Sequence, residues 1–330
     1  MGLSGQALGG QAREGELVSL SRRAMGSRFE IMLPPGDNQA VAAAQEALAL
    51  VADLERQMTV FRDDSEVSHI NRRAAREPVE VEAGLFGLLQ TAERLARETG
   101  GAFDVTAGPL TCLWSACRRE QRLPGADEVE QARRCVGMQH VRLDSERRTV
   151  AFARAGVKIN LGAIGKGYAL DRVREALQGR GVTAALVHGG HSSICALGRP
   201  PWEDAWTVSV RHPRGGERPL ARLRLREQGM GTSGSAEQFF EAAGKRYGHV
   251  IDPRSGWPAE GLLSATCTAP TAAEADALST AFFTMGVEAT RDYCAKHPGV
   301  AALLAVGGAG ENVVEVVNAG IPDDSLEAPV

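Results

Sequence analysis

The sequence lacks the features that mark several common classes of protein. No apolar run approaches the ~18 residues that a membrane-spanning helix needs, so no transmembrane segment is predicted. The net charge is −4, and no stripe of lysine or arginine alternates with aromatic residues, which argues against a nucleic-acid partner. The six cysteines include no CxxC pair, which argues against a zinc site and against a redox dithiol. We therefore expect reduced thiols, and an anionic ligand would have to be bound by local groups.

The N-terminus also lacks a secretory signal, because it has neither a basic segment nor an apolar one. Residues 1–16 are small, polar and rich in glycine, which predicts a flexible lead-in. Together with the reduced cysteines, this favours a cytoplasmic protein. A chain whose export signal had been removed would have the same sequence, so an exported, periplasmic protein is the alternative.

What is present is the composition of a globular enzyme, with 43% hydrophobic and 24% charged residues. Apolar residues follow helical spacing in some segments and alternate in others, which predicts an α+β fold with mixed, largely antiparallel sheets and packed helices. Residues 102–110 combine a strand-like start with a Gly-Pro turn. We expect one domain over residues 17–318, with two subdomains as an alternative, and an acidic C-terminal tail over 319–330. The clearest helices are predicted at 39–58, 82–99 and 273–286, and the clearest strands at 24–33, 184–187, 206–211, 221–226, 265–270, 300–306 and 313–317.

The stretch from Gly231 to Pro258 is polar and rich in glycine, without the apolar spacing of a core element. His249 lies just before the turn that begins at Asp252, and it is the side chain here that can exchange a proton near neutral pH. The stretch is therefore a candidate site. A β-hairpin whose histidine only ends a strand explains this stretch equally well.

A second candidate is the glycine-rich segment from Lys158 to Asp171, in which Lys166 stands among three glycines that open a helix running to Gly179. Backbone N–H groups at a helix start, with a lysine beside them, can bind phosphate. The segment is neither a Walker A loop nor a dinucleotide fingerprint, and glycines before helices are common, so the pattern alone is a weak signal.

A third candidate lies on the helix predicted at 273–286. Asp276 and Thr280 are four residues apart, so they share one helical face and can present a carboxylate and a hydroxyl to Mg²⁺. Such a pair also occurs on solvated helix faces, which is the stronger reading of this pattern in isolation. A metal site at His188 and His191 is less favoured than a polar loop, because no Cys, Asp or Glu stands beside them.

Taken together, several segments form a recognisable set in a fixed order between about residues 17 and 318. They are MGS at 25–27, FRDDSE at 61–66, FDVTAGPL at 103–110, INLGAIGKGYALDRV at 159–173, ALVHGGHSSICALG at 185–198, the stretch 231–258, and ADALSTAFFTMG at 275–286. With these segments the chain resembles the ApbE family, the FAD:protein FMN transferases. The resemblance implies an α+β fold of the ApbE type, related to the T-fold, which binds FAD beside Mg²⁺. It also implies transfer of the FMN half of FAD to a Thr or Ser hydroxyl of an acceptor protein, with release of AMP.

The resemblance also implies roles for individual residues. Lys166 would place a positive charge at the phosphates, and His249 would accept the proton of the acceptor hydroxyl, with Asp252 or a neighbour orienting it. The Mg²⁺ ligands would be the Ala163 carbonyl, Asp276 and Thr280, with Ser279 near them. The residues that would line the two ends of FAD are Met25, Phe61, Ala102, Phe103, Asp104, Asn160, Val250 and Ile251.

Four positions depart from the family pattern. Asn160 stands where Asp is usual, His188 where Asn is usual, His191 where Asp or Asn is usual, and Phe61 where Tyr is common. The change at Asn160 removes a carboxylate from the predicted FAD site. An active transferase is the favoured interpretation, and two alternatives are a Mg²⁺-dependent FAD pyrophosphatase and a non-catalytic protein that binds or delivers flavin. The acceptor and the oligomeric state are not specified by the sequence.

Overall fold

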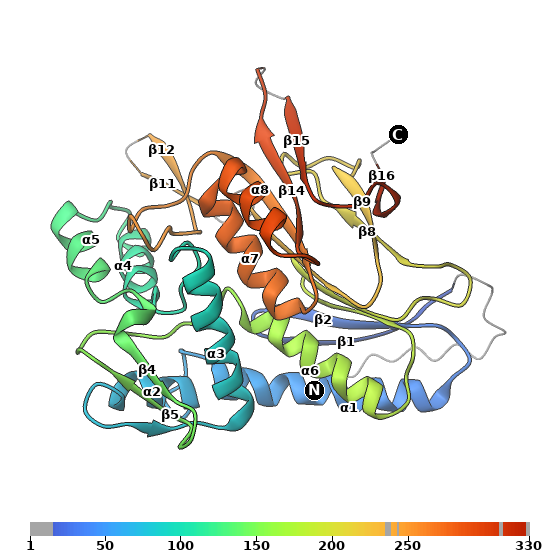
Figure 1. The fold of residues 1–330 in the computed structure, drawn as a ribbon, viewed down its shortest axis with the longest axis horizontal. Coiled ribbons are helices and arrows are strands. Elements are labelled where there is room, and N and C mark those ends of the chain that lie inside the picture. Colours follow the sequence, from blue (N-terminus) through green and yellow to red (C-terminus); the bar gives the residue numbers. More distant parts are fainter. Residues whose placement is uncertain (1–15, 235–238, 243, 310–312, 328–330) are drawn as a thin grey trace.

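The computed structural model describes residues 16–234, 239–242, 244–309 and 313–327. Its main element is an eight-stranded sheet whose neighbouring strands are all antiparallel, in the order β1-β2-β6-β7-β10-β13-β14-β15 (Figure 1). This confirms the predicted α+β fold with largely antiparallel sheets. The strands are β1 (Val18–Ala24), β2 (Ser27–Leu33), β6 (Ala185–Gly189), β7 (Ser193–Leu197), β10 (Gly229–Gly234), β13 (Leu262–Ala269), β14 (Ala301–Gly307) and β15 (Val314–Ala319).

Helices cover one face of this sheet. Helix α1 (Asn38–Met58) packs on β1 and β2, α6 (Gly165–Gly179) on β6 and β7, and α7 (Ala272–Met285) on β7, β10 and β13, while α8 (Val287–Lys296) contacts β14 and β15 (Figure 1). Of the helices in the described ranges, none is both long and apolar enough to cross a membrane.

The opposite face of the sheet is covered by a smaller sheet of β8 (Trp206–Val210), β9 (Ala221–Leu225) and β16 (Leu326–Glu327). The inward residues of β8 and β9, such as Val208 and Leu223, form a separate apolar cluster with main-sheet residues such as Ile194 and Met230. The alternation predicted for 206–211 and 221–226 is therefore correct. Strand β16 shows that the acidic C-terminal segment pairs with β9 up to Glu327.

A second group of elements packs beside the helical face. It contains α2 (Glu66–Arg73), α3 (Ala83–Glu98), α4 (Gly108–Arg119), α5 (Ala126–Arg133) and a sheet in the order β3-β5-β4, with β3 (Val79–Glu80), β5 (Thr149–Phe152) and β4 (Val141–Asp144). A separate hairpin joins β11 (Phe239–Ala242) to β12 (Lys245–Gly248). The buried residues of α1, α2, α3, α6 and α7 belong to one continuous apolar core, so the structure gives no separate core to α2 and α3.

Capping side chains fix the starts of two helices. The Asp37 carboxylate accepts hydrogen bonds from Gln39 N and Ala40 N at the start of α1, and Ser65 Oγ accepts one from Ser68 N at the start of α2. Asp and Ser are favoured at this position because their side chains bind N–H groups that lack a helical partner.

Two predicted features are wrong. Residues 102–106 form no strand; Ala107 makes an isolated bridge to Lys158, and Gly108–Pro109 begin α4 instead of a turn. Proline fits the first turn of a helix because no helical bond needs its N–H there. The sequence analysis also missed α8, which Gly286 separates from α7 by a left-handed φ of 79°.

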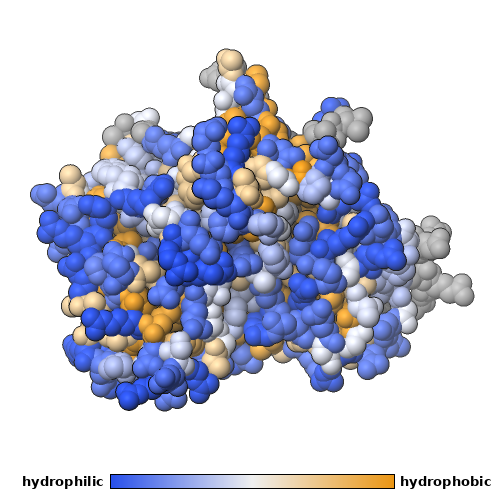
Figure 2. All heavy atoms as spheres, in the orientation of Figure 1, coloured by the Kyte–Doolittle hydropathy of each residue, from blue (hydrophilic) through white to orange (hydrophobic). Residues whose placement is uncertain are grey.

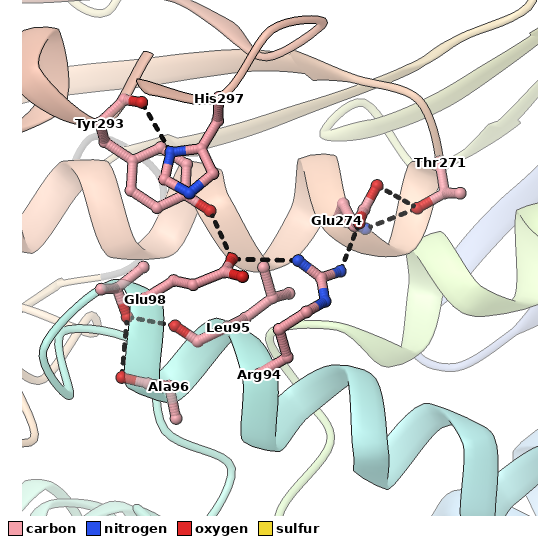
Figure 3. A network of polar contacts seen from close by, with 9 residues as sticks. Arg94, Leu95, Ala96, Glu98, Thr271, Glu274, Tyr293 and His297 are labelled. Carbon is pink, nitrogen blue, oxygen red and sulfur yellow. Dashed lines mark hydrogen bonds and ion pairs between the residues drawn. The ribbon is translucent and has the colours of Figure 1, made fainter. Parts of the chain in front are cut away.

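A polar network joins α3, α7 and the end of α8 (Figure 3). Arg94 donates to Glu98 at 3.0 Å and to Glu274 at 2.5 Å, and the Tyr293 hydroxyl donates to Glu98 at 3.0 Å. The ring of His297 stacks on Tyr293 with centroids 3.9 Å apart. These contacts tie the first turn of α7 to the second group of elements.

All six cysteines lie in the described ranges and none forms a disulfide, as expected for reduced thiols. Cys117, Cys195, Cys267 and Cys294 are buried, whereas Cys112 on α4 is exposed. The surface drawn in Figure 2 is mostly polar, with apolar atoms along the projecting β14–β15 hairpin, where Val313 and Val316 are about half exposed.

Candidate active site

Helix α7 lies unusually close to the N-terminal turn of α6 and to β10, because glycines face it from both. A Cβ atom at Gly167 would lie 2.0 Å from the carbonyl oxygen of Ala272, and one at Gly231 would lie 2.4 Å from that of Ala275. Real Cβ atoms do not come this near to backbone oxygens, so these positions require glycine. Gly167, Gly229 and Gly231 therefore allow α7 to pack closely on α6 and β10.

Asp276 is buried at the centre of this junction, with 5% of its surface exposed. Its Oδ1 accepts a hydrogen bond from Ser193 Oγ at 2.6 Å, and its Oδ2 accepts one from Gly167 N at 2.7 Å. Lys166 Nζ lies 4.0 Å from Oδ2. The two sequence candidates, the lysine loop and the Asp/Thr helix, thus form one site.

Burial raises the pKa of Asp276, and the charge of Lys166 and the hydrogen bonds from Ser193 and Gly167 oppose that rise. The N-terminus of α6, which carries a partial positive charge, also faces this carboxylate. A buried carboxylate with one lysine beside it is a group that a further cation would keep ionised.

Hydroxyl groups surround the next turn of α7. Ser233 Oγ on β10 lies 3.0 Å from Ser279 Oγ and 3.1 Å from Thr280 Oγ1. Ser279 also donates to the carbonyl of Asp276 at 2.8 Å. The predicted metal residues Asp276, Ser279 and Thr280 are therefore grouped within little more than one helical turn.

The carbonyl of Ala163 is not needed by α6, whose first helical bond runs from Tyr168 N to Ile164 O. The predicted metal residues offer only hard oxygen donors, namely a carbonyl, a carboxylate and hydroxyls, which suits Mg²⁺ and not a metal that prefers nitrogen or sulfur. Within the described ranges no three His, Cys, Asp or Glu side chains gather as a metal cluster. The residues present therefore fit Mg²⁺ with one carboxylate.

The predicted flavin segment at 102–104 meets the C-terminal end of α7. Thr284 Oγ1 donates to the carbonyl of Ala102 at 3.2 Å, and Ala102 and Phe103 are both buried. Arg254 donates to the carbonyl of Thr284 at 2.8 Å and to both oxygens of Asp252. The segments 102–103 and 252–254 are therefore fixed to the same end of α7, one turn beyond Thr280.

Asp104 is engaged within the protein. Its Oδ1 accepts hydrogen bonds from the N–H and hydroxyl of Thr106 at 2.8 and 2.6 Å, and its Oδ2 accepts one from Met138 N at 3.0 Å. Burial raises the pKa of Asp104, and these hydrogen bonds oppose the rise. In this structure the carboxylate organises the turn before α4, and its predicted contact with FAD stays a prediction.

Asn160 is held next to the same segment. Its N–H donates to the carbonyl of Val105 at 2.7 Å, and its Oδ1 accepts a hydrogen bond from Gly162 N at 2.9 Å. The preceding residue, Ile159, exchanges two hydrogen bonds with the side chain of Asn71 on α2. The backbone at 159–162 is thus fixed between the 102–107 segment and the N-terminus of α6.

Met25 and Phe61, two further residues predicted to line FAD, lie on the loops that follow β1 and α1. Met25 has a left-handed φ of 49° in the turn between β1 and β2, and its N–H donates to Glu55 at 2.7 Å. A non-glycine residue in this region is strained and is often found at functional sites. Phe61 is 94% exposed on the loop after α1, and Met58 at the end of α1 lies close to Gly165 at the start of α6.

His249 follows β12 on an exposed bend, and Val250 behind it is buried. Both Asp252 oxygens are occupied by the guanidinium of Arg254, so this carboxylate faces arginine. Ile251 is half-buried and packs against a small apolar cluster with Leu110 and Val129. The roles of His249 as base and of Asp252 as its orienting group stay predictions.

Sequence reasoning missed Ser193 and Ser233, which complete the polar surroundings of α7. They lie on β7 and β10, in segments that were noted for other residues, and only the pairing of these strands brings them to Asp276 and Thr280. His188 lies beside Gly190 and Glu30, with Nε2 3.7 Å from a Glu30 oxygen, and His191 is exposed.

Comparisons with known proteins identify the family of this chain. The sequence pattern of the ApbE family matches residues 25–304. A Treponema pallidum protein named FAD:protein FMN transferase is 35% identical over 278 residues, which are 80% of this chain and 76% of the relative. A protein of the same name from Haemophilus influenzae is 32% identical over 296 residues, which are 86% of this chain and 85% of the relative.

Solved structures show the same likeness. The crystal structure of the ApbE protein from Thermotoga maritima has a TM-score of 0.81 and 31% identity, covering 91% of this chain and 96% of that one. The apo form of the flavinyl transferase ApbE from Pseudomonas stutzeri has a TM-score of 0.81 and 28% identity, covering 96% of this chain and 98% of that one. The resemblance seen in the sequence motifs is confirmed, and the chain belongs to the ApbE family.

Proposed function

We propose that this protein transfers the FMN half of FAD to a threonine or serine hydroxyl of an acceptor protein, in a Mg²⁺-dependent reaction that releases AMP. The observation that carries the proposal is the junction of α6 and α7, where Asp276, Lys166 and the hydroxyls of Ser279 and Thr280 meet a helix N-terminus. A pyrophosphate is the part of FAD that such a charged, oxygen-rich site would bind. The names of the relatives support the same reaction.

The reaction needs a phosphate-binding group and a proton acceptor. The acceptor oxygen forms a bond to the flavin-side phosphorus, the bond from that phosphorus to the bridging oxygen breaks, and AMP leaves with the bridging oxygen. The hydroxyl proton passes to His249, which we assign as the base because an imidazole titrates near neutral pH. Its exposed position after β12 is one that a folded acceptor protein can approach.

Lys166 would hold the pyrophosphate oxygens, because its ammonium group carries positive charge and the N-terminus of α6 adds a partial positive charge beside it. Asp276, Thr280, Ser279 and the Ala163 carbonyl would hold Mg²⁺. When bound, the ion supplies positive charge against the phosphate oxygens. We assign Lys166 and the metal residues to the pyrophosphate of FAD. Phe61 and Met25 are assigned to one of its two ring systems, the flavin or the adenine, as the resemblance implies.

The test is incubation of the purified protein with FAD, MgCl₂ and a candidate acceptor, followed by the mass of the acceptor. We expect an increase equal to one FMN group, and none when the acceptor threonine is replaced by valine. AMP and FMN without a modified acceptor would instead show hydrolysis of FAD. FAD that stays intact with every acceptor and Mg²⁺ concentration would show a binding protein and overturn the proposal.

A further inference from the structure

Two side chains accept hydrogen bonds from the backbone N–H groups of the first turn of α7, one from α6 and one from the residue just before α7. Ala272 N and Ala273 N donate to the two carboxylate oxygens of Asp171, each at 2.8 Å. Glu274 N donates to Thr271 Oγ1, the ordinary cap of the helix, at 3.2 Å. These are the N–H groups that the start of a helix leaves without a helical acceptor, so Asp171 satisfies two of them from outside α7.

Asp171 belongs to α6, the helix that carries Lys166. It lies one turn after Gly167, so both residues are on the face of α6 that meets α7. Gly167 contacts the carbonyl of Ala272, and Asp171 binds the N–H of the same residue. The backbone of Ala272 is therefore contacted by two successive turns of α6, at its carbonyl by Gly167 and at its N–H by Asp171.

This contact fixes the part of α7 that carries the candidate metal ligand. Asp276 is one turn after Ala272, and its Oδ2 accepts the hydrogen bond from Gly167 N. Sliding α7 along α6 would break the bonds of Asp171 and lengthen the Gly167–Asp276 bond together. The hydrogen bonds of Asp171 and the hydrogen bond of the Asp276 carboxylate thus depend on the same placement of α7 against α6.

Burial raises the pKa of Asp171 to about 6, and the hydrogen bonds from Ala273 N and Ala272 N and the charge of Arg174 oppose that rise. The group is therefore ionised at pH 8. Arg174, one turn further along α6, pairs with Glu227 at 2.5 Å. Glu227 in turn accepts a hydrogen bond from Gly198 N at 2.5 Å.

We propose that Asp171 is a positioning residue, which sets α7 against α6 so that Asp276 and Lys166 are spaced to hold the divalent cation and the pyrophosphate. The inference rests on the proposed function, because it assigns Asp276 to the cation. Asp171 touches neither Asp276 nor Lys166 through a hydrogen bond in the described structure, and it acts through the backbone of Ala272 and Ala273.

The test compares two variants at the same helix end. Asp171→Asn replaces one acceptor oxygen with an NH₂ group, which is a donor. The N–H of Ala272 or Ala273 then faces another donor and loses its hydrogen bond. Thr271→Ala removes the ordinary cap of the helix and leaves the contact with α6 unchanged. Asp171→Glu keeps the charge but adds a methylene, which separates the effect of charge from that of position.

Mg²⁺ affinity is measured by calorimetry at pH 8 with FAD present and no acceptor, beside the melting temperature of each variant. We expect Asp171→Asn and Asp171→Glu to weaken Mg²⁺ binding about tenfold, the usual cost of losing a group that orients a metal ligand. Thr271→Ala should lower the melting temperature and keep the affinity within about twofold.

The inference is overturned if both Asp171 variants bind Mg²⁺ like the wild type, or if Thr271→Ala weakens binding as much as they do. It is also overturned if the wild type binds no Mg²⁺. A wild type that binds Mg²⁺ and FAD but modifies no acceptor would refute the proposed function alone, and the comparison of variants would still decide the role of Asp171.

Discussion

The α6–α7 junction and the turn that carries His249 differ in how firmly the fold determines them. At the junction, Asp276 is buried and held by Ser193 and Gly167, and glycines let backbone pack on backbone. His249 stands on an exposed bend after a separate two-stranded hairpin. The proposed phosphate end of the site is therefore built into the core, and the proposed proton acceptor lies at the surface, where the proposed protein substrate would enter.

This contrast predicts that substitutions at the junction affect both the fold and the reaction, whereas substitutions at the turn affect the reaction alone.

Asp276→Ala should abolish Mg²⁺-dependent FMN transfer, because hydroxyls and a carbonyl cannot balance the charge of a divalent cation alone. Asp276→Asn, which keeps the shape but not the charge, should be equally inactive. Transfer rates are measured across a Mg²⁺ titration. An Asp276→Ala protein with wild-type activity at low Mg²⁺ would show that the metal assignment is wrong.

His249→Ala should slow transfer by about two to four orders of magnitude, the usual contribution of a general base, and leave FAD binding unchanged. The melting temperature should also stay near that of the wild type, since the side chain is exposed. Single-turnover rates and an FAD titration check both statements. Unchanged transfer would remove His249 from the mechanism, and a large loss of stability would contradict the division between the two regions.

Gly167→Ala should destabilise the fold by about 1–3 kcal/mol, because the added Cβ meets the Ala272 carbonyl and forces α6 and α7 apart. Gly87→Ala in α3 is the matched control, since a Cβ there meets no atom within 4 Å and alanine favours the helix by up to about 1 kcal/mol. Denaturant unfolding of both variants gives the comparison. Equal stability of the two would mean that α7 can shift without cost.

Asn160→Asp should have the smallest effect, a few-fold gain in FAD affinity or transfer rate, because it restores one carboxylate where the family usually has one. Asp can keep the bond that Asn160 Oδ1 accepts from Gly162 N, so the local backbone should not change. Asn160→Ala, which removes that acceptor, should change the affinity in the opposite direction. FAD titrations of the three proteins decide it, and a weaker Asn160→Asp protein would refute the expectation.

The parts of this fold that local chemistry determines could be predicted from the sequence. The helix predicted at 39–58 is α1, which begins directly after its Asp37 cap, and the alternation of β8 and β9 was readable in the chain. The spacing of Asp276 and Thr280 gave the helix face, while their role came from the resemblance to the family. Helix α8 was missed because its apolar spacing follows that of α7 after a single glycine, Gly286.

The contacts that complete the site depend on strand order, which no local pattern contains. Ser193 reaches Asp276 because β7 lies beside β10, whose residues face α7. Asp171 was part of a recognised motif, yet its contact with Ala272 crosses 101 positions of sequence. The same limit applies to Asp104, whose contact with Met138 crosses 34 positions of sequence; its predicted contact with FAD stays a prediction.

The distribution of cysteines has a practical consequence for following this protein in solution. Thiols react as thiolates, and burial raises the pKa of Cys195 to about 12 and that of Cys294 to about 11, so both resist alkylation in the folded state. Cys112 is exposed on α4, whose residue Trp114 donates a hydrogen bond to Gly256 in the turn after Asp252. A maleimide fluorophore should therefore attach first at Cys112. Because α4 contacts the turn after Asp252, this label would lie near the proposed acceptor site, and its fluorescence should change when the acceptor protein binds.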